Sequence, residues 1–356
     1  MSNQKNALQA IIERFFELQE LKYREWDEDF FDEDTCDIVT IRRREIVTDK
    51  PSLEEEQLLE QINSKLSEID TDTLFRLKDE IIWGTMDKYS IWKELNDRGV
   101  LGFPWKLIQD GVVTLPEDME EIPENYFQCC YFLTSVVFPK NLKRIGNRAF
   151  YLCESITDMR IPDGVTSIGD KAFEDCDSLI SVHIPDSVTS IGESAFSGCF
   201  ALTEITIPDG VTSIGESAFF CCIALTEITI PNGVTSIGDK AFEDCDSLIS
   251  VHIPDSVTSI GDWAFSECSA LTEITIPNSV TSIGEYAFSH CSSLATITIP
   301  NSVINIGDEA FWGCSLLTTI DYAGTREQWK KIEKSERWNN DSNIKIIRCT
   351  DGKIKL

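Results

Sequence analysis

Most of the chain repeats one pattern of apolar and polar positions with a period of 23 residues. One complete unit runs from Leu202 to Ala224 and reads L-x-x-I-x-I-P-x-x-V-x-x-I-G-x-x-A-F-x-x-C-x-x. Self-similarity at a fixed period of this length is typical of solenoids, in which stacked copies bury a core that no single copy could bury. The pattern therefore predicts a repeat solenoid.

Within each unit, two short extended pieces are expected. Ile205 and Ile207 lie two residues apart with Thr206 between them, which predicts a strand buried on one face. The proline that follows has no N–H and should end the strand ladder, and a polar turn comes next. Val211 and Ile214 then predict a second extended piece that re-enters the core before a glycine bends the chain.

The third piece of the unit has helical spacing. Ala218, Phe219 and Cys222 occupy positions i, i+1 and i+4, which predicts a helical turn packed on its inner side, and hence an α+β repeat solenoid. The phenylalanine recurs at positions 127, 150, 173, 196, 219, 242, 265, 288 and 311. About nine repeats are expected, the first of them degraded, which would extend for roughly 43 Å at about 4.8 Å per strand.

The two ends of the chain lack the repeat. Residues 1–100 predict a mainly helical N-terminal domain, because several apolar sets follow a helical period and Ser52 with Glu55 forms a capping box. This region also contains the acidic segment WDEDFFDEDTCD, which lacks the glycine and glutamate of a calcium loop, and the basic run 42–44. The solenoid is assigned to residues 101–322 and a C-terminal cap to residues 323–356.

The C-terminal cap should contain one helix and one hairpin. Thr325 to Lys334 predicts a short helix with Trp329 and Ile332 turned inward. Residues 344–349 and 353–356 predict a hairpin around Asp351-Gly352. This region would cover the last strand edge of the solenoid.

The repeat resembles the bacterial leucine-rich repeat of the BspA type, also called the Treponema-type repeat. The resemblance covers about residues 112–356, and the segments IDYAGTREQW and IIRCTDGKI with Trp338 are similar to the usual C-terminal closure of that family. It implies a curved or gently twisted solenoid that acts in adhesion or protein interaction without catalysis. Many members are exported and displayed on the cell surface, whereas this chain has a helical N-terminal region and no evident signal.

The charge of the chain is strongly negative. The formal net charge is −30, and residues 155–320 alone contain 23 acidic and three basic residues, which gives −20. This balance argues against binding nucleic acid or an anionic membrane and favours a basic protein partner. Glu13 and Arg14 interrupt the first apolar stretch, so no signal peptide is expected, and no run of 18 apolar residues predicts a membrane span. We therefore expect a cytoplasmic protein.

Nine of the 13 cysteines occupy one repeat position, and they recur together with the apolar positions. Neighbouring repeats would hold them about 4.8 Å apart, farther than the roughly 3.8 Å between the Cβ atoms of a disulfide. Buried free thiols are therefore expected. One sulfur per repeat without a nearby histidine cannot build a metal cage, so neither a metal nor another cofactor is expected.

No catalytic residues are predicted, and we expect a protein that is not an enzyme. Serine and aspartate surround each histidine because they fill the turns, and no phosphate-binding glycine loop follows a strand. Residues 170–192 and 239–261 are identical, so His183 and His252 are copies about 14 Å apart at three strand spacings, too far to share a ligand.

Two surfaces are candidates for partner binding. The first is the outward face of the strands, which carries His183, Glu204, Glu227, His252 and Glu273. On the opposite edge, Trp263 and Tyr286 should lie side by side, with Phe220 and Trp312 three positions further along their own units. Clustered exposed aromatic residues are enriched at binding sites, but these could equally pack on one another or on the N-terminal region.

Three functions of different class remain open. The favoured one is a non-enzymatic protein-interaction module, an intracellular scaffold or adaptor, that binds a protein partner on an extended acidic surface. The second is an acidic inhibitor or immunity-type protein that neutralises a basic toxin or nuclease. The third is an enzyme or signalling unit in residues 1–100 with the repeats as a targeting arm. A surface adhesin would fit if an export signal is missing from the sequence, and the oligomeric state is left open.

Overall fold

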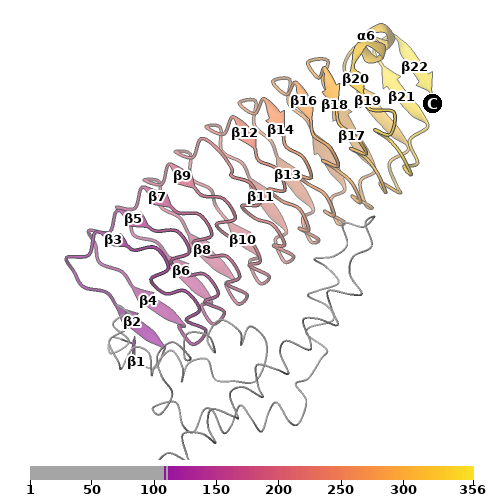
Figure 1. The fold of residues 1–356 in the computed structure, drawn as a ribbon. Helices are drawn as coiled ribbons and strands as arrows, with labels where there is room; N and C mark the ends of the chain where they lie inside the picture. The colour runs from indigo at the N-terminus through magenta and orange to yellow at the C-terminus, as the bar shows by residue number, and fades with distance from the viewer. Residues whose placement is uncertain (1–107, 110) are drawn as a thin grey trace, which may run out of the picture. The chain divides into compact units, whose positions relative to one another are not determined.

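The chain divides into two compact units, Met1–Trp105 and Lys106–Leu356. The computed structural model describes residues 108, 109 and 111–356. The predicted helical domain 1–100, with its acidic segment and the basic run 42–44, lies outside the described residues. The second unit is a β-solenoid whose successive 23-residue turns, here called rungs, stack along one axis (Figure 1).

One side of the solenoid, here called the strand face, is formed by one short parallel strand from each rung. A first short strand, β1 (Ile108–Gln109), pairs antiparallel with β2. The strands of this face are β2 (Val112–Thr114), β4 (Ser135–Val137), β6 (Asp158–Arg160), β8 (Ser181–His183), β10 (Glu204–Ile205), β11 (Glu227–Thr229), β13 (Ser250–His252), β15 (Glu273–Thr275), β17 (Thr296–Ile299), β19 (Thr319–Tyr322) and β21 (Ile346–Cys349). Where neighbours from β2 to β19 pair, each residue lies beside the one 23 positions later, as in the alignment of Glu227 with Ser250. Strand β21 pairs with β19 at an offset of 27 residues, as in the alignment of Ile320 with Ile347.

The second extended piece of each rung forms a second parallel sheet. Its strands are β3 (Glu121–Ile122), β5 (Arg144–Ile145), β7 (Ser167–Ile168), β9 (Ser190–Ile191), β12 (Ser236–Ile237), β14 (Ser259–Ile260), β16 (Ser282–Ile283), β18 (Asn305–Ile306) and β20 (Glu333–Lys334). Between β9 and β12 the sheet is reduced to isolated bridges at Ile214. The two predicted extended pieces are thus confirmed.

The core is a stack of identical side chains. All nine repeat phenylalanines are fully buried, and neighbouring rings lie parallel with centroids 5.0–5.7 Å apart. The repeat cysteines are buried beside them as free thiols, which confirms the prediction. Each of the eight thiols from Cys153 onwards donates to the carbonyl of the phenylalanine in the preceding rung, at 3.0–3.3 Å. This hydrogen bond explains why cysteine, a small residue with a weak S–H donor, suits that buried position.

The predicted helical turn is wrong. Ser217 and Cys221 have φ angles of 53° and 56°, in the left-handed region, which no helix continues through. The backbone N–H of Phe219 donates to Ala241 of the next rung at 2.9 Å, whereas that of Cys222 closes a turn on Phe219 at 3.2 Å. Alternate N–H groups therefore bond between rungs, so the repeats form a β-solenoid and not an α+β one. Five residues are too few for their spacing to distinguish a helical turn from two such turns.

The C-terminal cap has the predicted helix and hairpin, but the helix does not continue to Lys334, because Glu333 and Lys334 form a strand that pairs with β18. Helix α6 (Arg326–Lys331) has a capping box built from Thr325 and Gln328, and it buries Trp329. Strand β21 extends the strand face and forms a hairpin with β22 (Gly352–Lys355). The ring of Trp338 meets Phe311 edge to face at 6.0 Å and so closes the phenylalanine stack. Within the described part of the chain, no helix is long and apolar enough to cross a membrane.

Candidate partner-binding surfaces

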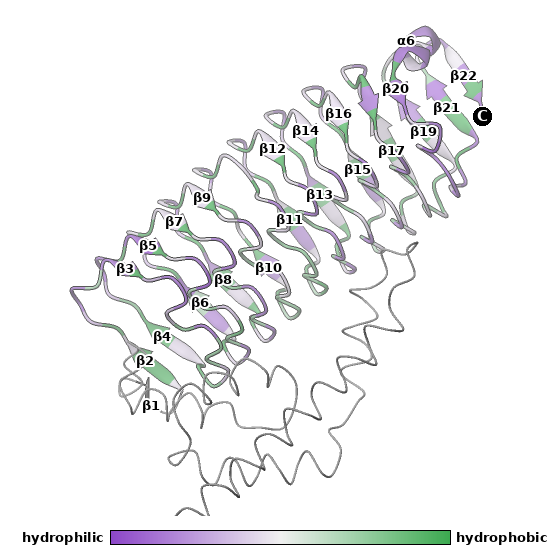
Figure 2. Ribbon diagram, in the orientation of Figure 1, coloured by the Kyte–Doolittle hydropathy of each residue, from purple (hydrophilic) through white to green (hydrophobic). Residues whose placement is uncertain are grey.

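The strand face presents its predicted residues to solvent. His183, Glu204, Glu227, His252 and Glu273 are all exposed, while the apolar residues that alternate with them on the strands are buried or half-buried. His183 lies beside Arg160 and His252 beside Thr229, and strands β10 and β11 separate the two histidines. Figure 2 shows hydrophilic colour on β6, β10, β11 and β15 of this face and hydrophobic colour on β2 and β4. The strand face is thus a regular, mostly polar surface whose side chains differ from rung to rung.

On the turns at the other edge, four aromatic side chains form a continuous cluster that we call the aromatic corner, made of Trp263, Tyr286, His290 and Trp312. The rings of Trp263 and Tyr286 are stacked, with centroids 4.1 Å apart and 15° between their planes. Trp312 meets Tyr286 edge to face at 6.3 Å and His290 at 4.3 Å. All four side chains are half-buried.

Sequence reasoning placed Trp263 beside Tyr286 correctly but missed part of the cluster. His290 follows Tyr286 by four residues and contacts Trp312 of the neighbouring rung, although the two residues occupy different repeat positions. Phe220 is half-buried two rungs before Trp263, and among the residues described it makes no ring contact with the aromatic corner. The rings therefore pack on one another, one of the two alternatives, with their remaining surface exposed.

The backbone of the aromatic corner is strained for large side chains. Trp263 and Tyr286 have φ angles of 59° and 52°. Bulky residues rarely adopt this left-handed region, which costs on the order of 1–3 kcal/mol. In the other rungs the same repeat position holds residues with polar side chains, namely Asn125, Arg148, Lys171, Ser194, Ser217, Lys240 and Glu309. The turn therefore requires a positive φ, but it does not require aromatic side chains.

Charged groups flank the aromatic corner on both sides. Lys240 Nζ lies 5.6 Å from the centroid of the Trp263 ring and 3.6 Å from Glu243 Oε2. Burial raises the pKa of Glu243 to about 7, while the Lys240 ammonium opposes that rise. On the other side, burial and a hydrogen bond with Glu309 raise the pKa of Tyr286 above its ordinary value.

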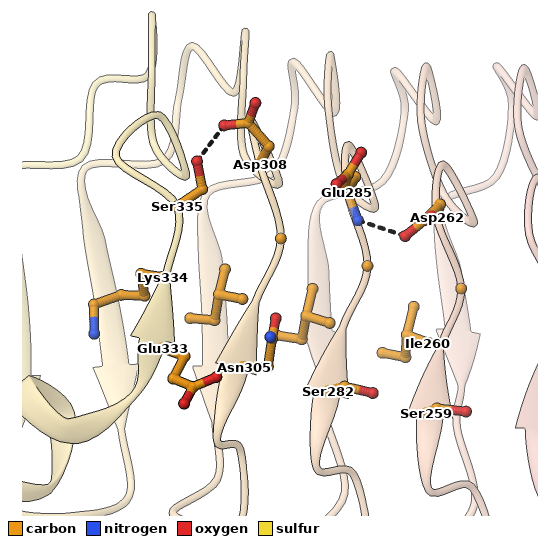
Figure 3. A pocket seen from close by; sticks show the side chains of 15 residues that line it. Ser259, Ile260, Asp262, Ser282, Glu285, Asn305, Asp308, Glu333, Lys334 and Ser335 are labelled. Atoms are coloured by element: carbon orange, nitrogen blue, oxygen red, sulfur yellow. Dashed lines mark hydrogen bonds between the residues drawn. The ribbon is translucent and has the colours of Figure 1, made fainter.

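Beside the aromatic corner, a shallow groove crosses the second sheet. It has a volume of about 770 Å³ and extends over the last rungs and β20. Glycines of successive rungs lie one above another along the middle of the groove. Only glycine fits there, because a Cβ at Gly284 would lie 2.5 Å from the backbone of Gly261 in the preceding rung. Figure 3 shows Ser259, Ser282 and Asn305 along one side and Asp262, Glu285 and Asp308 along the other. The repeated S-I-G motif thus sets the rung spacing and leaves a groove with an acidic wall, a feature that sequence reasoning missed.

Hydrogen bonds along the acidic wall tie consecutive rungs together. Asp239 and Asp262 each accept a bond from the backbone N–H of the residue 23 positions later, at 2.8 and 2.7 Å. Asn147 and Asp170 do the same at 3.0 Å. Carboxylates in this wall therefore have a structural role as well as a surface one.

The described residues contain no group of three or more His, Cys, Asp or Glu side chains placed to hold a metal ion. Burial raises the pKa of the Cys222 thiol to about 12, so this sulfur is a poor nucleophile at neutral pH. The candidate sites in the described residues are therefore surfaces, namely the strand face, the aromatic corner and the acidic wall of the groove.

Comparison with known proteins identifies the repeat. The family model described as "BspA type Leucine rich repeat region (6 copies)" matches residues 120–249 and 212–345, which together span more than half of the chain. The chain belongs to the BspA-type leucine-rich repeat family. A search of curated proteins found no match.

Several solved structures of leucine-rich repeat proteins are similar to this BspA-type chain. A leucine-rich repeat protein from Bacteroides ovatus is 27% identical with a TM-score of 0.53, over 67% of this chain and 68% of that one. A leucine-rich cell surface protein from Faecalibacterium prausnitzii is 29% identical with a TM-score of 0.40, over 62% and 81%. The T. pallidum leucine-rich repeat protein is 31% identical with a TM-score of 0.43, over 45% and 77%. The similarity to the Bacteroides ovatus protein agrees with a leucine-rich repeat solenoid.

Proposed function

We propose that this BspA-type protein is a non-enzymatic interaction module that binds a protein partner on the outer surface of its solenoid. The observation that carries the proposal is the difference between the buried and the exposed positions of the repeat. Core positions keep the same residue from rung to rung, whereas the exposed positions of the strand face and of the turns vary. A rigid surface with variable side chains suits recognition, since little ordering cost is paid on binding.

The charge of the repeats supports a basic partner. Residues 155–320 carry 23 acidic and three basic residues, and Glu204, Glu227 and Glu273 lie exposed on the strand face. Opposite charge on the partner would speed encounter and disfavour acidic competitors. The proposed site is therefore the strand face together with the adjoining turns.

Affinity capture with the full-length chain tests this function. The wild-type protein and two variants would be used to recover partners from a native lysate, followed by mass spectrometry. One variant is Glu204→Gln/Glu227→Gln/Glu273→Gln on the strand face, and the other is Trp263→Ser/Tyr286→Ser at the aromatic corner. We expect at least one variant to lose a partner that the wild type retains. Identical recovery by all three proteins would contradict binding through these surfaces.

A second candidate is an acidic inhibitor of a basic toxin or nuclease, which the same negative charge favours. Steered association of this kind weakens steeply with ionic strength. The affinity for the recovered partner should then fall at least about tenfold between 50 and 500 mM salt. A constant affinity over this range would remove the inhibitor from consideration. We further propose a cytoplasmic location for either function, which fractionation of the source cells would test.

A further inference from the structure

The C-terminal cap places an arginine on the acidic wall, directly beside the aromatic corner. The Arg337 guanidinium contacts Asp308 Oδ2 through one nitrogen and lies 3.0 Å from Glu309 Oε1 through another. It thereby bridges two consecutive residues of the same turn. Asn340 lies 3.4 Å from the same Glu309 oxygen, so this carboxylate is held by the cap and is buried.

The two repeat positions whose side chains contact Arg337 recur in the preceding rungs, where one of the two residue types differs. In the positions of Asp308 and Glu309, the rung before has Glu285 and Tyr286, and the rung before that has Asp262 and Trp263. The acid of the groove wall is kept, while an aromatic ring replaces the second carboxylate. A guanidinium forms charge-assisted bonds with carboxylates and also lies favourably over aromatic rings. Each of these rungs therefore offers an acid and a ring where the last rung offers two acids.

A cation is already placed against the other end of this array. Lys240, in the same column as Trp263, holds its ammonium 5.6 Å from the indole centroid. Arg337 and Lys240 thus show, at opposite ends of the Trp263–Tyr286 stack, that the local geometry accommodates positive side chains. Between them, Glu285 is exposed and Tyr286 is half-buried.

The rings themselves are not needed to build the turn. Serine stands at the same column in two consecutive rungs, Ser194 and Ser217, with φ angles of 52° and 53°. Aromatic residues at this strained position need another explanation, and strain of this kind is concentrated at functional sites.

We propose that the aromatic corner, together with Asp262 and Glu285, is the docking site for an arginine-bearing segment of a protein partner. The inference rests on the proposed function and specifies its surface and the chemistry of the partner. Arg337 bridges Asp308 and Glu309 one rung later. By analogy, each guanidinium of the partner would bond a carboxylate of the groove wall, and the aromatic ring that stands in place of the second carboxylate would be its other contact. The net charge of −20 over residues 155–320 attracts such a segment before contact.

Fluorescence anisotropy with a labelled Gly-Arg repeat peptide tests the site. The full-length protein would be titrated against this peptide and against a matched Gly-Lys peptide at physiological salt. The variant Trp263→Ser/Tyr286→Ser removes both rings without changing the charge. We expect it to bind the Gly-Arg peptide about tenfold more weakly than wild type, since two cation–π contacts are lost. The wild type should prefer the Gly-Arg peptide to the Gly-Lys peptide.

A control variant separates this site from general charge attraction. Glu117→Gln/Glu120→Gln removes two exposed carboxylates from the turn between β2 and β3 and leaves the aromatic corner intact. We expect it to change the Gly-Arg affinity less than about twofold. Trp312→Ser, which introduces the serine found at the same column in Ser266 and Ser289, gives a second ring deletion should the double variant be unstable.

Unchanged Gly-Arg affinity in the ring variants, or equal binding of the two peptides, would overturn the proposal. A larger loss of Gly-Arg affinity in the carboxylate control than in the ring variants would do the same. The proposed function is judged separately by the captured partner: if that partner depends on the strand face alone, the module binds proteins but the aromatic corner is not its arginine site.

Discussion

Replacing Glu216 with aspartate should stabilise the solenoid at the rung where the second sheet is interrupted. Along the acidic wall, Asp239 and Asp262 accept the backbone N–H of the residue one rung later, but glutamate is one methylene longer. Among the described residues, Glu193 and Glu216 accept no such bond. Glu193 and Glu216 occupy this position in two consecutive rungs, and at these rungs the second sheet has only isolated bridges at Ile214.

Local distances agree with a looser contact at this rung. A Cβ on Gly215 would lie 3.2 Å from the preceding rung, compared with 2.5 Å at Gly192 and 2.7 Å at Gly238. The Ile214 N–H reaches the Ser236 carbonyl only at 3.5 Å. Glu216→Asp would let the carboxylate accept the Asp239 N–H with no change of charge. One added hydrogen bond contributes about 0.5–1.5 kcal/mol. For a unit of this size, that corresponds to a rise of about 1–6 °C in the melting temperature.

Hydrogen exchange at the Asp239 amide is the most direct assay. The bond should slow exchange about 2- to 13-fold, and calorimetry should show the rise in melting temperature. Glu204→Asp makes the same chemical change on the strand face, where no such ladder exists, and should leave both quantities unchanged. Faster exchange at Asp239, or a lower melting temperature for Glu216→Asp, would refute the reasoning.

Three further predictions concern the core and the cap. Phe219→Ala removes a fully buried ring from the middle of the stack and should lower the free energy of unfolding by about 3–5 kcal/mol in urea denaturation; a loss below about 1 kcal/mol would show that the stack can collapse around the gap. Burial raises the pKa of Cys222 and Cys314 to about 12, so the folded state keeps these thiols protonated after unfolded thiols begin to ionise. Stability should therefore be intact below about pH 8.5 and fall above it by about 1.4 kcal/mol per pH unit for each such thiol, and a flat urea midpoint from pH 8 to 10 would contradict this. Arg337→Ala leaves the buried Glu309 without its guanidinium and should speed amide exchange in β21 and β22, whereas Lys330→Ala, which breaks only the exposed pair with Glu327, should not.

The sequence was most informative where one residue type repeats in one role. The period, the buried faces of both extended pieces, the free thiols and the hairpin after Cys349 all followed from local pattern. The left-handed turns at Ser217 and Cys221 did not, because Ala-Phe-x-x-Cys has the spacing of a helical turn and nothing local shows that its N–H groups bond to the next rung.

For the candidate surfaces, the 23-residue period placed Trp263 beside Tyr286. It could not reveal contacts between different repeat positions or contacts made by the cap. The contact of His290 with Trp312 depends on the turn geometry, and the ion pair of Arg337 with Glu309 depends on how the chain folds back after α6. The interruption at Glu216 was equally hidden, since glutamate and aspartate look interchangeable until the length of the side chain is compared with the rung spacing.

Hydroxyl-radical footprinting of the full-length protein, alone and with its captured partner, tests the central claim most directly, because it reports the solvent exposure of individual side chains. If the solenoid surface binds the partner, oxidation should fall at Trp263, Tyr286 and Trp312, or at His183 and His252 on the strand face, while buried Phe219 stays unreactive in both states. Protection confined to residues outside 108–356, with every one of these side chains oxidised as in the free protein, would contradict the account.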